Sequence, residues 1–323
     1  MARLMKRIAV TGSVAYDTIM LFPGRFSEHI LPEKTHLINV SFLVERLDRR
    51  RGGTASNIAY TLALLGEHPL LCAAVGADFD ADAQVLAAAG VDVSATLRCE
   101  DVPTASGFIT TDMDDNQITA FHPGAMSRAA AIDLRIHAGV VDCVVVAPDS
   151  PDAMAVHVEQ AVTMGSRLVF APAQQLPSLS DATLTAGLRA AWLIVGNDYE
   201  LELVRARTGL GVDDLRRRGA MVALTRGAQG SELHSDEGMV AIPAAPATLV
   251  DPTGAGDAYI AGLLAGIRRG LEPPVAGRVA ALAAAYVVES SGTQEHRFTL
   301  DEFAARYERS FGAALLGLAG SPS

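Results

Sequence analysis

Short apolar runs alternate with longer segments of helical periodicity between residues 140 and 208. The apolar runs have the length and the Val, Leu and Ile content of buried strands, and the segments between them carry apolar residues at helical spacing. Repeated βα units of this kind fold into a mostly parallel sheet with helices on both faces. The alternation therefore predicts a doubly wound α/β fold. The strands are expected at 140–147, 167–171 and 192–196, and the helices at 151–164, 181–190 and 199–208.

A second, smaller sheet is indicated in the first half of the chain. Two β-rich runs flank the polar loop 112–116, an arrangement typical of a hairpin, and two further strand-like stretches precede it. An α/β layer fold of 323 residues accommodates one small appended element. We therefore expect a single α/β domain, 1–323, with an inserted β-sheet lid. The lid is expected at about 14–22, 34–44 and 105–122.

Composition excludes several classes of function. A net charge of −11 and a pI near 5.2 disfavour a surface that binds nucleic acid or anionic membranes. The most apolar run, 140–147, is too short to cross a membrane. Cys72, Cys99 and Cys143 have no metal-ligand spacing, and buried free thiols in a reducing compartment explain them. We expect a cytoplasmic protein whose partners are small molecules.

A glycine-rich turn leads into a helix near residue 254. Gly254, Ala255 and Gly256 precede Asp257, and apolar side chains recur at helical spacing between 260 and 267. The first backbone N–H groups of a helix have no partner within the helix, and the helix dipole favours an anion beside them. Asp257 at such a place is either an ordinary cap or part of a reactive site.

The reactive interpretation is a kinase. The amides of residues 254–257 are placed to neutralise charge on a phosphoryl group, while Asp257 takes a proton from the attacking hydroxyl. The alternative is a structural glycine-rich turn. Residues without bulk at all three positions, and a second acid at Asp251, argue for more than a cap, but the spacing alone leaves the structural turn open.

The segment 251–257, D-P-T-G-A-G-D, resembles the C-terminal motif D-T-x-G-A-G-D of the ribokinase (PfkB) family of carbohydrate and nucleoside kinases. It departs from the motif at Pro252, where the family usually has Thr. The resemblance implies a ribokinase-like fold with ATP and Mg²⁺ as cofactors. It also implies a monovalent cation, with K⁺ as the candidate, held by Asp251, Thr253 and carbonyls of the loop 290–295.

Two further motifs of that family match in the first sixty residues. The family's G-S-x-x-x-D, which places an acid on the sugar hydroxyls, falls on Ser13 and Asp17. Its G-G-x-x-x-N, which lies over the sugar, falls on Gly52, Gly53 and Asn57. Without the resemblance, Asp17 is equally a turn residue, and the paired glycines are equally a turn before a helix.

Several segments resemble bacterial adenosine kinases in particular. These are F-P-G-R-F-S-E at 22–28, S-F-L-V starting at Ser41, and the segment 121–126, in which Phe121 corresponds to an aromatic that stacks on the base. Gln174 and Gln175 match a Q-Q pair. The sequence departs from adenosine kinases at Gly107, where they have a second aromatic, and at Ala171, where they have an acid.

Two motifs correspond to the nucleotide site of the family. Asn197 and Glu200 match N-x-x-E, which orders magnesium and phosphates through water, although Asn197 is equally an ordinary helix cap. The loop 225–230 matches T-[KR/L]-G-x-x-G, and Arg226 is the local cation on an otherwise acidic chain. The matching residues of this loop are Thr225, Arg226, Gly227 and Gly230.

Together these motifs predict transfer of the ATP γ-phosphoryl group to the 5′-hydroxyl of adenosine, giving AMP and ADP. One alternative is another acceptor: ribose, fructose or a different nucleoside. A second is a nucleoside- or nucleotide-binding regulator without catalysis, although a regulator has no need of Asp257. Exposed strand edges of the lid predict a homodimer formed through it.

Overall fold

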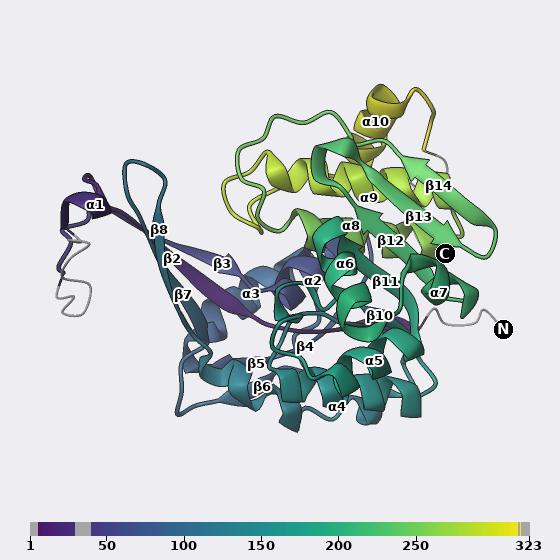
Figure 1. Cartoon of the computed structure of the whole chain (residues 1–323), viewed down its shortest axis with the longest axis horizontal. Helices are drawn as coiled ribbons and strands as arrows, with labels where there is room; N and C mark the ends of the chain where they lie inside the picture. The colour runs from purple at the N-terminus through teal and green to yellow at the C-terminus, as the bar shows by residue number, and fades with distance from the viewer. Residues whose placement is uncertain (1–5, 30–39, 316, 318–323) are drawn as a thin grey trace.

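The structure is a computed structural model that describes residues 6–29, 40–315 and 317. Its main sheet has the strand order β14-β13-β12-β11-β10-β9-β1-β4. Pairing is parallel from β4 to β12 and antiparallel from β12 to β14 (Figure 1). The strands are β1 (Arg7–Thr11), β4 (Leu70–Cys72), β9 (Val141–Val146), β10 (Arg167–Phe170), β11 (Ala191–Asn197), β12 (Met221–Thr225), β13 (Ser231–Ser235) and β14 (Gly238–Ile242).

Helices cover both faces of this sheet because its strands are apolar on both sides. In β9, Val145 packs into one core, and its neighbours Val144 and Val146 pack into the other. The predicted doubly wound α/β fold is thus confirmed. On the face of Val145 lie α2 (Thr54–Leu64), α3 (Asp80–Ala89), α8 (Ala255–Arg268), α9 (Pro273–Val288) and α10 (Leu300–Phe311); on the other lie α4 (Pro151–Thr163), α5 (Asp181–Ala190), α6 (Asp198–Thr208) and α7 (Val212–Arg217).

Helix α8 starts at the predicted glycine-rich turn and is held tightly against α9. A Cβ on Gly262 would lie 2.6 Å from the Cα of Ala280, so glycine lets the two backbones meet. Ile260, Leu263 and Leu264 are buried, as the helical spacing predicts. The N-terminus of α8 is therefore carried by a rigid pair of helices.

A four-stranded sheet projects from the main body as the lid (Figure 1). Its order is β3-β2-β7-β8, with β2 parallel to β7 and the outer pairs antiparallel. A short separate pair, β5 (Ala74–Gly76) and β6 (Leu97–Cys99), lies below it. The lid strands are β2 (Ala15–Leu21), β3 (Arg46–Gly52), β7 (Ala105–Thr111) and β8 (Gln117–His122).

One predicted lid strand is misplaced. The stretch expected at 34–44 lies outside the described residues up to position 39, and residues 40–44 form no strand. Phe42 instead packs on the rings of Phe22 and Phe26, with centroids 4.7 and 5.0 Å away. The strand that pairs with β2 is β3, which follows. The sequence does not indicate this strand, because four of its seven residues are arginines and no apolar alternation marks it. The arginines are instead paired with acidic side chains.

Two expectations from composition can be compared with the described residues. Cys72, Cys99 and Cys143 are free and buried there, and burial raises the pKa of Cys72 and Cys143 to about 12, which keeps both as thiols. Across the same residues, no helix combines the length and apolar character needed to span a lipid bilayer.

Candidate functional site

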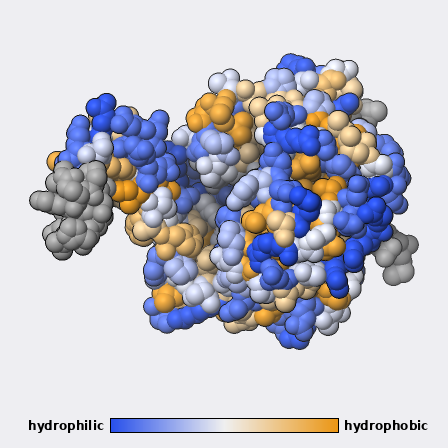
Figure 2. All heavy atoms as spheres, in the orientation of Figure 1, coloured by the Kyte–Doolittle hydropathy of each residue, from blue (hydrophilic) through white to orange (hydrophobic). Residues whose placement is uncertain are grey.

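A cavity of about 800 Å³ lies between the lid and the carboxyl ends of the parallel strands, where open α/β sheets bind ligands. Figure 2 shows the surface hollowed between the lid and the main body. Most of the predicted site residues line it. They are Ser13, Asp17, Gly52, Gly53, Asn57, Phe121, Gln174, Gln175, Asn197, Glu200, Thr225, Gly227, Thr253, Gly254, Ala255, Gly256 and Asp257.

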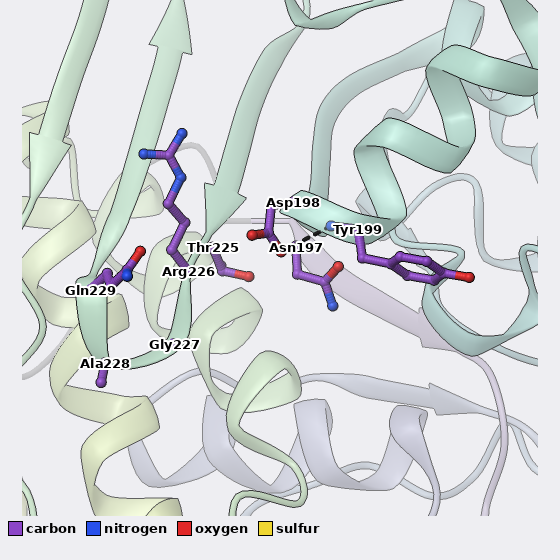
Figure 3. A pocket seen from close by; sticks show the side chains of 8 residues that line it. All are labelled: Asn197, Asp198, Tyr199, Thr225, Arg226, Gly227, Ala228 and Gln229. Atoms are coloured by element: carbon purple, nitrogen blue, oxygen red, sulfur yellow. Dashed lines mark hydrogen bonds between the residues drawn. The ribbon is translucent and has the colours of Figure 1, made fainter.

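A second cavity of about 560 Å³ adjoins the first, because Asn197, Thr225 and Gly227 line both. It lies between the start of α6 and the turn after β12 (Figure 3). A Cβ on Gly227 would meet no described atom within 4 Å, so a ligand can approach the backbone of this turn. The remaining lining residues are Asp198, Tyr199, Arg226, Ala228 and Gln229.

The N-terminus of α8 opens into the main cavity. Gly254 caps it at φ +81°, and a Cβ there would lie 2.9 Å from Thr293 Cγ2, so glycine is required on both counts. The amide of Ala255 donates to the carbonyl of Pro252 at 3.3 Å. The amides of Gly254, Gly256 and Asp257 have no acceptor among the described residues and face the cavity as free donors. The anion cradle therefore has one amide fewer than the four expected from the sequence.

Asp257 lies at the wall of this cavity, half-buried, in the first turn of α8. Burial raises the pKa of its carboxyl group to about 7, against the opposing effect of a hydrogen bond that Asn57 Nδ2 donates to Asp257 Oδ2 at 2.8 Å. A carboxylate with a pKa near neutrality accepts a proton more readily than an ordinary aspartate. Asp257 therefore has the position and the basicity of a general base.

Thr293 and Gln294 fix the orientation of Asn57, a role that the sequence does not predict for them. Thr293 Oγ1 and Gln294 Nε2 donate to Asn57 Oδ1 at 2.8 and 2.9 Å. Because the carbonyl end of the amide is held by two donors, its nitrogen must face Asp257. Asn57, which the resemblance assigns to the sugar, is thus also the residue that orients the carboxyl group of Asp257. No local pattern could reveal these contacts, since more than 230 positions separate the partners.

The raised pKa of Asp257 predicts that its charged form, which can accept a proton, lowers the stability of the folded protein. Because the pKa in the folded protein lies above its ordinary value of 3.8, the stabilising contribution is complete below pH 3.8 and is lost as the pH rises through about 7. An Asp257→Asn protein should therefore be more stable than the wild type at pH 8. The gain in the free energy of unfolding is at most about 4 kcal/mol, because water that reaches the half-buried carboxylate reduces the cost of its charge. The gain should shrink at pH 4.5. Urea unfolding at both pH values measures it; an equal effect at both would contradict the pKa.

The lid supplies Asp17 to the opposite side of the cavity. Asp17 on β2 pairs in register with Gly107 on β7, and Gly107 pairs with Phe121 on β8. Added Cβ atoms on Gly52 and Gly107 would lie 2.8 and 2.9 Å from the Asp17 carboxylate. Gly107, where an aromatic was expected by resemblance, thus makes room for Asp17. Burial, and then the charge of Asp251, raises the pKa of Asp17, while Arg50 opposes this.

Two residues of the sugar motifs have structural reasons of their own. Gly53 has φ +94°, and a Cβ there would lie 2.5 Å from the carbonyl oxygen of Ser13. Backbone packing therefore requires this glycine, apart from the place over the sugar that the family resemblance implies for it. The hydroxyl of Ser13 accepts from the amide of Thr54 at 3.1 Å and so caps α2, although Ser13 also lines the cavity.

The residues of the N-x-x-E motif form a capping box. Asn197 Oδ1 accepts from the Glu200 amide at 2.8 Å, and Glu200 Oε2 accepts from the Asn197 amide at 2.9 Å. The alternative that Asn197 is a helix cap is therefore correct. Both residues nevertheless face the main cavity, and burial raises the pKa of Glu200. The cap places one carboxylate oxygen of Glu200 and leaves the other for a further partner.

Arg226 is not a free cation. Its Nη1 lies 2.6 Å from Glu232 Oε1 on β13, and His234 shares the same carboxylate. Figure 3 shows the guanidinium turned away from Asn197 and Tyr199. The local cation predicted at Arg226 is thus paired with an acid, because the strand that pairs with β12 carries Glu232 opposite the loop. Arg226 still lines the second cavity.

Three predicted residues do not line either cavity. Ser41 is exposed at the outer end of the lid, next to Phe42, which packs on Phe22 and Phe26. Gly230 has φ +90°, and a Cβ there would lie 2.2 Å from the carbonyl oxygen of Ile242, so its role is to form the turn. Asp251 holds the turn before α8, where its Oδ1 accepts from the amide of Thr253 at 2.9 Å.

Ala173, beside Gln174, has φ +40°, a strained conformation for alanine in the cavity wall.

The fold and the cavity together define an α/β protein with a carboxyl group of raised pKa beside free helix N-terminal amides, and with a second cavity next to it. Residues 5–299 match the pfkB family carbohydrate kinases, and the chain belongs to this family. The predicted family membership is confirmed.

Similar proteins extend over nearly the whole chain. A nucleoside kinase of Methanothermobacter thermautotrophicus is 31% identical over 85% of this chain and 90% of its own length. The structure of Burkholderia thailandensis nucleoside kinase in complex with inosine has a TM-score of 0.84 at 39% identity, covering 95% of this chain and 99% of that one. The nucleoside kinase of Methanocaldococcus jannaschii, described as an archaeal member of the ribokinase family, has a TM-score of 0.82 at 26% identity, with 94% and 99% covered. The fold is ribokinase-like.

Proposed function

We propose that this protein transfers the γ-phosphoryl group of ATP to a hydroxyl group of a nucleoside. The observation that carries the proposal is the carboxylate of Asp257, which lies beside the free amides at the start of α8 and is oriented by Asn57. The similar proteins named as nucleoside kinases support a nucleoside acceptor, and one of them is described in complex with ADP and inosine.

Each part of the cavity has a task in this reaction. Asp257 accepts the proton of the attacking hydroxyl, and the amides of Gly256 and Asp257 stabilise the charge that develops on the phosphoryl oxygens. Asp17 accepts hydrogen bonds from ribose hydroxyls on the opposite wall. Because little covalent chemistry falls to the protein, positioning and charge stabilisation are sufficient.

The second cavity suits the phosphoryl donor. ATP bound with Mg²⁺ supplies the transferable group, and the open backbone at Gly227 together with Thr225 would hold it. Glu200 would hold a water bound to Mg²⁺ through its free carboxylate oxygen, which suits this hard cation. Asn197 joins both cavities and keeps Glu200 in place.

Within the nucleosides we propose the 5′-hydroxyl of adenosine as the acceptor, giving AMP and ADP. Phe121 on β8 lines the main cavity and is 53% exposed, as a platform for a base must be before the base binds. Inosine is the second candidate, because the similar B. thailandensis enzyme is described with it.

A panel of acceptors tests the proposal. Adenosine, inosine, other nucleosides, ribose and fructose are incubated with the protein and Mg-ATP, and ADP formation is measured. We expect a nucleoside to exceed both free sugars in kcat/KM. Faster turnover of ribose would make the protein a sugar kinase. Tight nucleoside binding without any turnover would instead support a regulator.

Removing the aromatic platform tests how the base is held. Phe121→Ala should raise KM for the preferred nucleoside about 5- to 150-fold, because base stacking on an aromatic is worth about 1–3 kcal/mol. The rate with ribose, which has no base, should not change. Phe108→Ala is the control, since Phe108 lies on the neighbouring strand and outside the cavity lining. Equal effects of the two substitutions would contradict stacking on Phe121.

We also propose that two copies associate through their lids. Leu47, Phe108 and Ile118 are exposed, and the strand register places them on the face opposite Asp17 and Phe121. A contiguous exposed apolar face on a sheet with open edges favours pairing with a second copy. Light scattering should give the mass of a dimer, and Phe108→Asp should give a monomer. A monomeric wild type at micromolar concentration would contradict the proposal.

A further inference from the structure

Arg50 joins the lid to the main body beside the catalytic helix. It lies on β3, directly opposite Asp17 in the register, and its side chain is 22% exposed. Its Nη1 lies 3.7 Å from Asp251 Oδ2, and its Nη2 lies 3.6 Å from Asp48 Oδ2. The guanidinium thus lies among three acids: Asp17 and Asp48 of the lid, and Asp251 of the turn before α8.

The loop after α9 packs next to the side chain of Arg50. Gly292 has φ +114°, and a Cβ there would lie 3.6 Å from Arg50 Cδ and 3.2 Å from Glu295 Cγ. The next residue of the strand, Arg51, pairs with Glu295 at 2.6 Å. The end of β3 is therefore fastened to the same loop that carries Thr293 and Gln294, which orient Asn57.

Asp251, Thr253 and this loop are the groups that the family resemblance assigns to a monovalent cation. In this structure the carboxylate of Asp251 is already engaged on both sides. Its Oδ1 accepts from the Thr253 amide at 2.9 Å, and its Oδ2 faces the guanidinium of Arg50. A potassium ion at that carboxylate would lie beside a like charge, which opposes its binding. The residues present therefore do not fit a monovalent cation held by Asp251.

We propose that Arg50 takes the place of the monovalent cation as a tethered positive charge. It neutralises Asp251 and holds the turn 251–253 that leads into the anion cradle at Gly254. Because the arginine comes from the lid, the lid is held to the catalytic turn without any added ion. Arg50 is a positioning residue, and its kinetic consequence depends on the phosphoryl transfer proposed above: turnover needs no added potassium.

An arginine suits this task better than a lysine. Its planar group presents several donors at once, so it can face Asp48 and Asp251 together, and it stays charged at every physiological pH. Lysine at this position would keep the charge and lose the double contact.

Thermal unfolding tests the proposal without any assay of activity. The melting temperature is measured in KCl and in choline chloride at equal ionic strength. The wild type should melt at the same temperature in both salts, and Arg50→Ala should melt lower in choline chloride and recover part of the loss in KCl. Arg46→Ala is the matched control, since Arg46 is also on β3 and also pairs with Asp48. A melting temperature of the wild type that rises with KCl over choline chloride would overturn the proposal.

The kinetic experiment uses the same salts and proteins. Wild-type kcat should be equal in KCl and choline chloride, while Arg50→Ala should lose at least 10-fold in choline chloride and regain several-fold in KCl. Arg50→Lys should fall between the two. Arg50→Ala that behaves as Arg46→Ala does, or whose loss potassium does not relieve, would overturn the proposal. Lack of turnover with every acceptor would refute the proposed function, and the melting temperatures would still decide the role of Arg50.

Discussion

Replacing Asp257 with asparagine is expected to lower kcat/KM for the nucleoside by about 10²- to 10⁴-fold, the usual contribution of a general base. Asparagine keeps the shape and can still accept the hydrogen bond from Asn57 Nδ2, so the wall of the cavity remains in place. What is lost is the capacity to take up the proton of the attacking hydroxyl. KM should change little, because asparagine can still hydrogen-bond the 5′-hydroxyl and the contacts to the nucleobase and to the other ribose hydroxyls remain.

The control for this substitution is Asp133→Asn. Asp133 lies outside both cavities, where it pairs with Arg135, and its replacement changes the net charge by the same amount. It should leave kcat/KM unchanged. Unchanged turnover in the Asp257→Asn protein would remove Asp257 as the base, whatever the family of the chain.

Replacing Asn57 with leucine should have the second largest effect. Its amide lowers the pKa of Asp257 through the 2.8 Å hydrogen bond, so its loss should raise that pKa further above about 7. Because the base acts only when deprotonated, the acid limb of the pH profile of kcat should move to higher pH, and kcat at pH 7 should fall. Gln294 would also keep a buried donor without its acceptor, which costs about 1–3 kcal/mol of stability, whereas the hydroxyl of Thr293 still donates to the carbonyl of Arg51 at 3.1 Å.

The pH profile separates orientation of the base from loss of structure. A folded Asn57→Leu protein with reduced kcat and an unmoved acid limb would show that Asn57 acts on the substrate alone. Thr293→Val is the milder companion, since Gln294 still holds the carbonyl of Asn57 in it. A smaller shift in the same direction is expected there.

The α/β repeat and the start of α8 could be predicted because their signals are local. Strands β9 to β11 and helices α4 to α6 follow from apolar periodicity within windows of about ten residues, and the glycine-rich turn marks the start of the helix that carries Asp257. The motifs that line the main cavity could be recognised by their resemblance to those of the ribokinase family.

What escaped prediction depends on partners far away in the sequence. Strand β3 has no hydrophobic face and is defined by its pairing with β2. The ion pair of Arg226 with Glu232 forms only because β13 folds back on β12. The orientation of Asn57 comes from Thr293 and Gln294, and these meet it only in the folded chain. Composition and spacing carry no record of such contacts.

The most direct test of the account is the distance between the Asp257 carboxylate and the 5′-oxygen of a bound nucleoside, measured in a crystal structure with ADP and Mg²⁺ present. The proposed mechanism predicts that this distance is about 2.6–3.2 Å, the length of one hydrogen bond, and that the ribose hydroxyls donate to Asp17. A nucleoside whose 5′-oxygen lies against another wall of the cavity, or an Asp257 side chain turned away from it, would contradict the account.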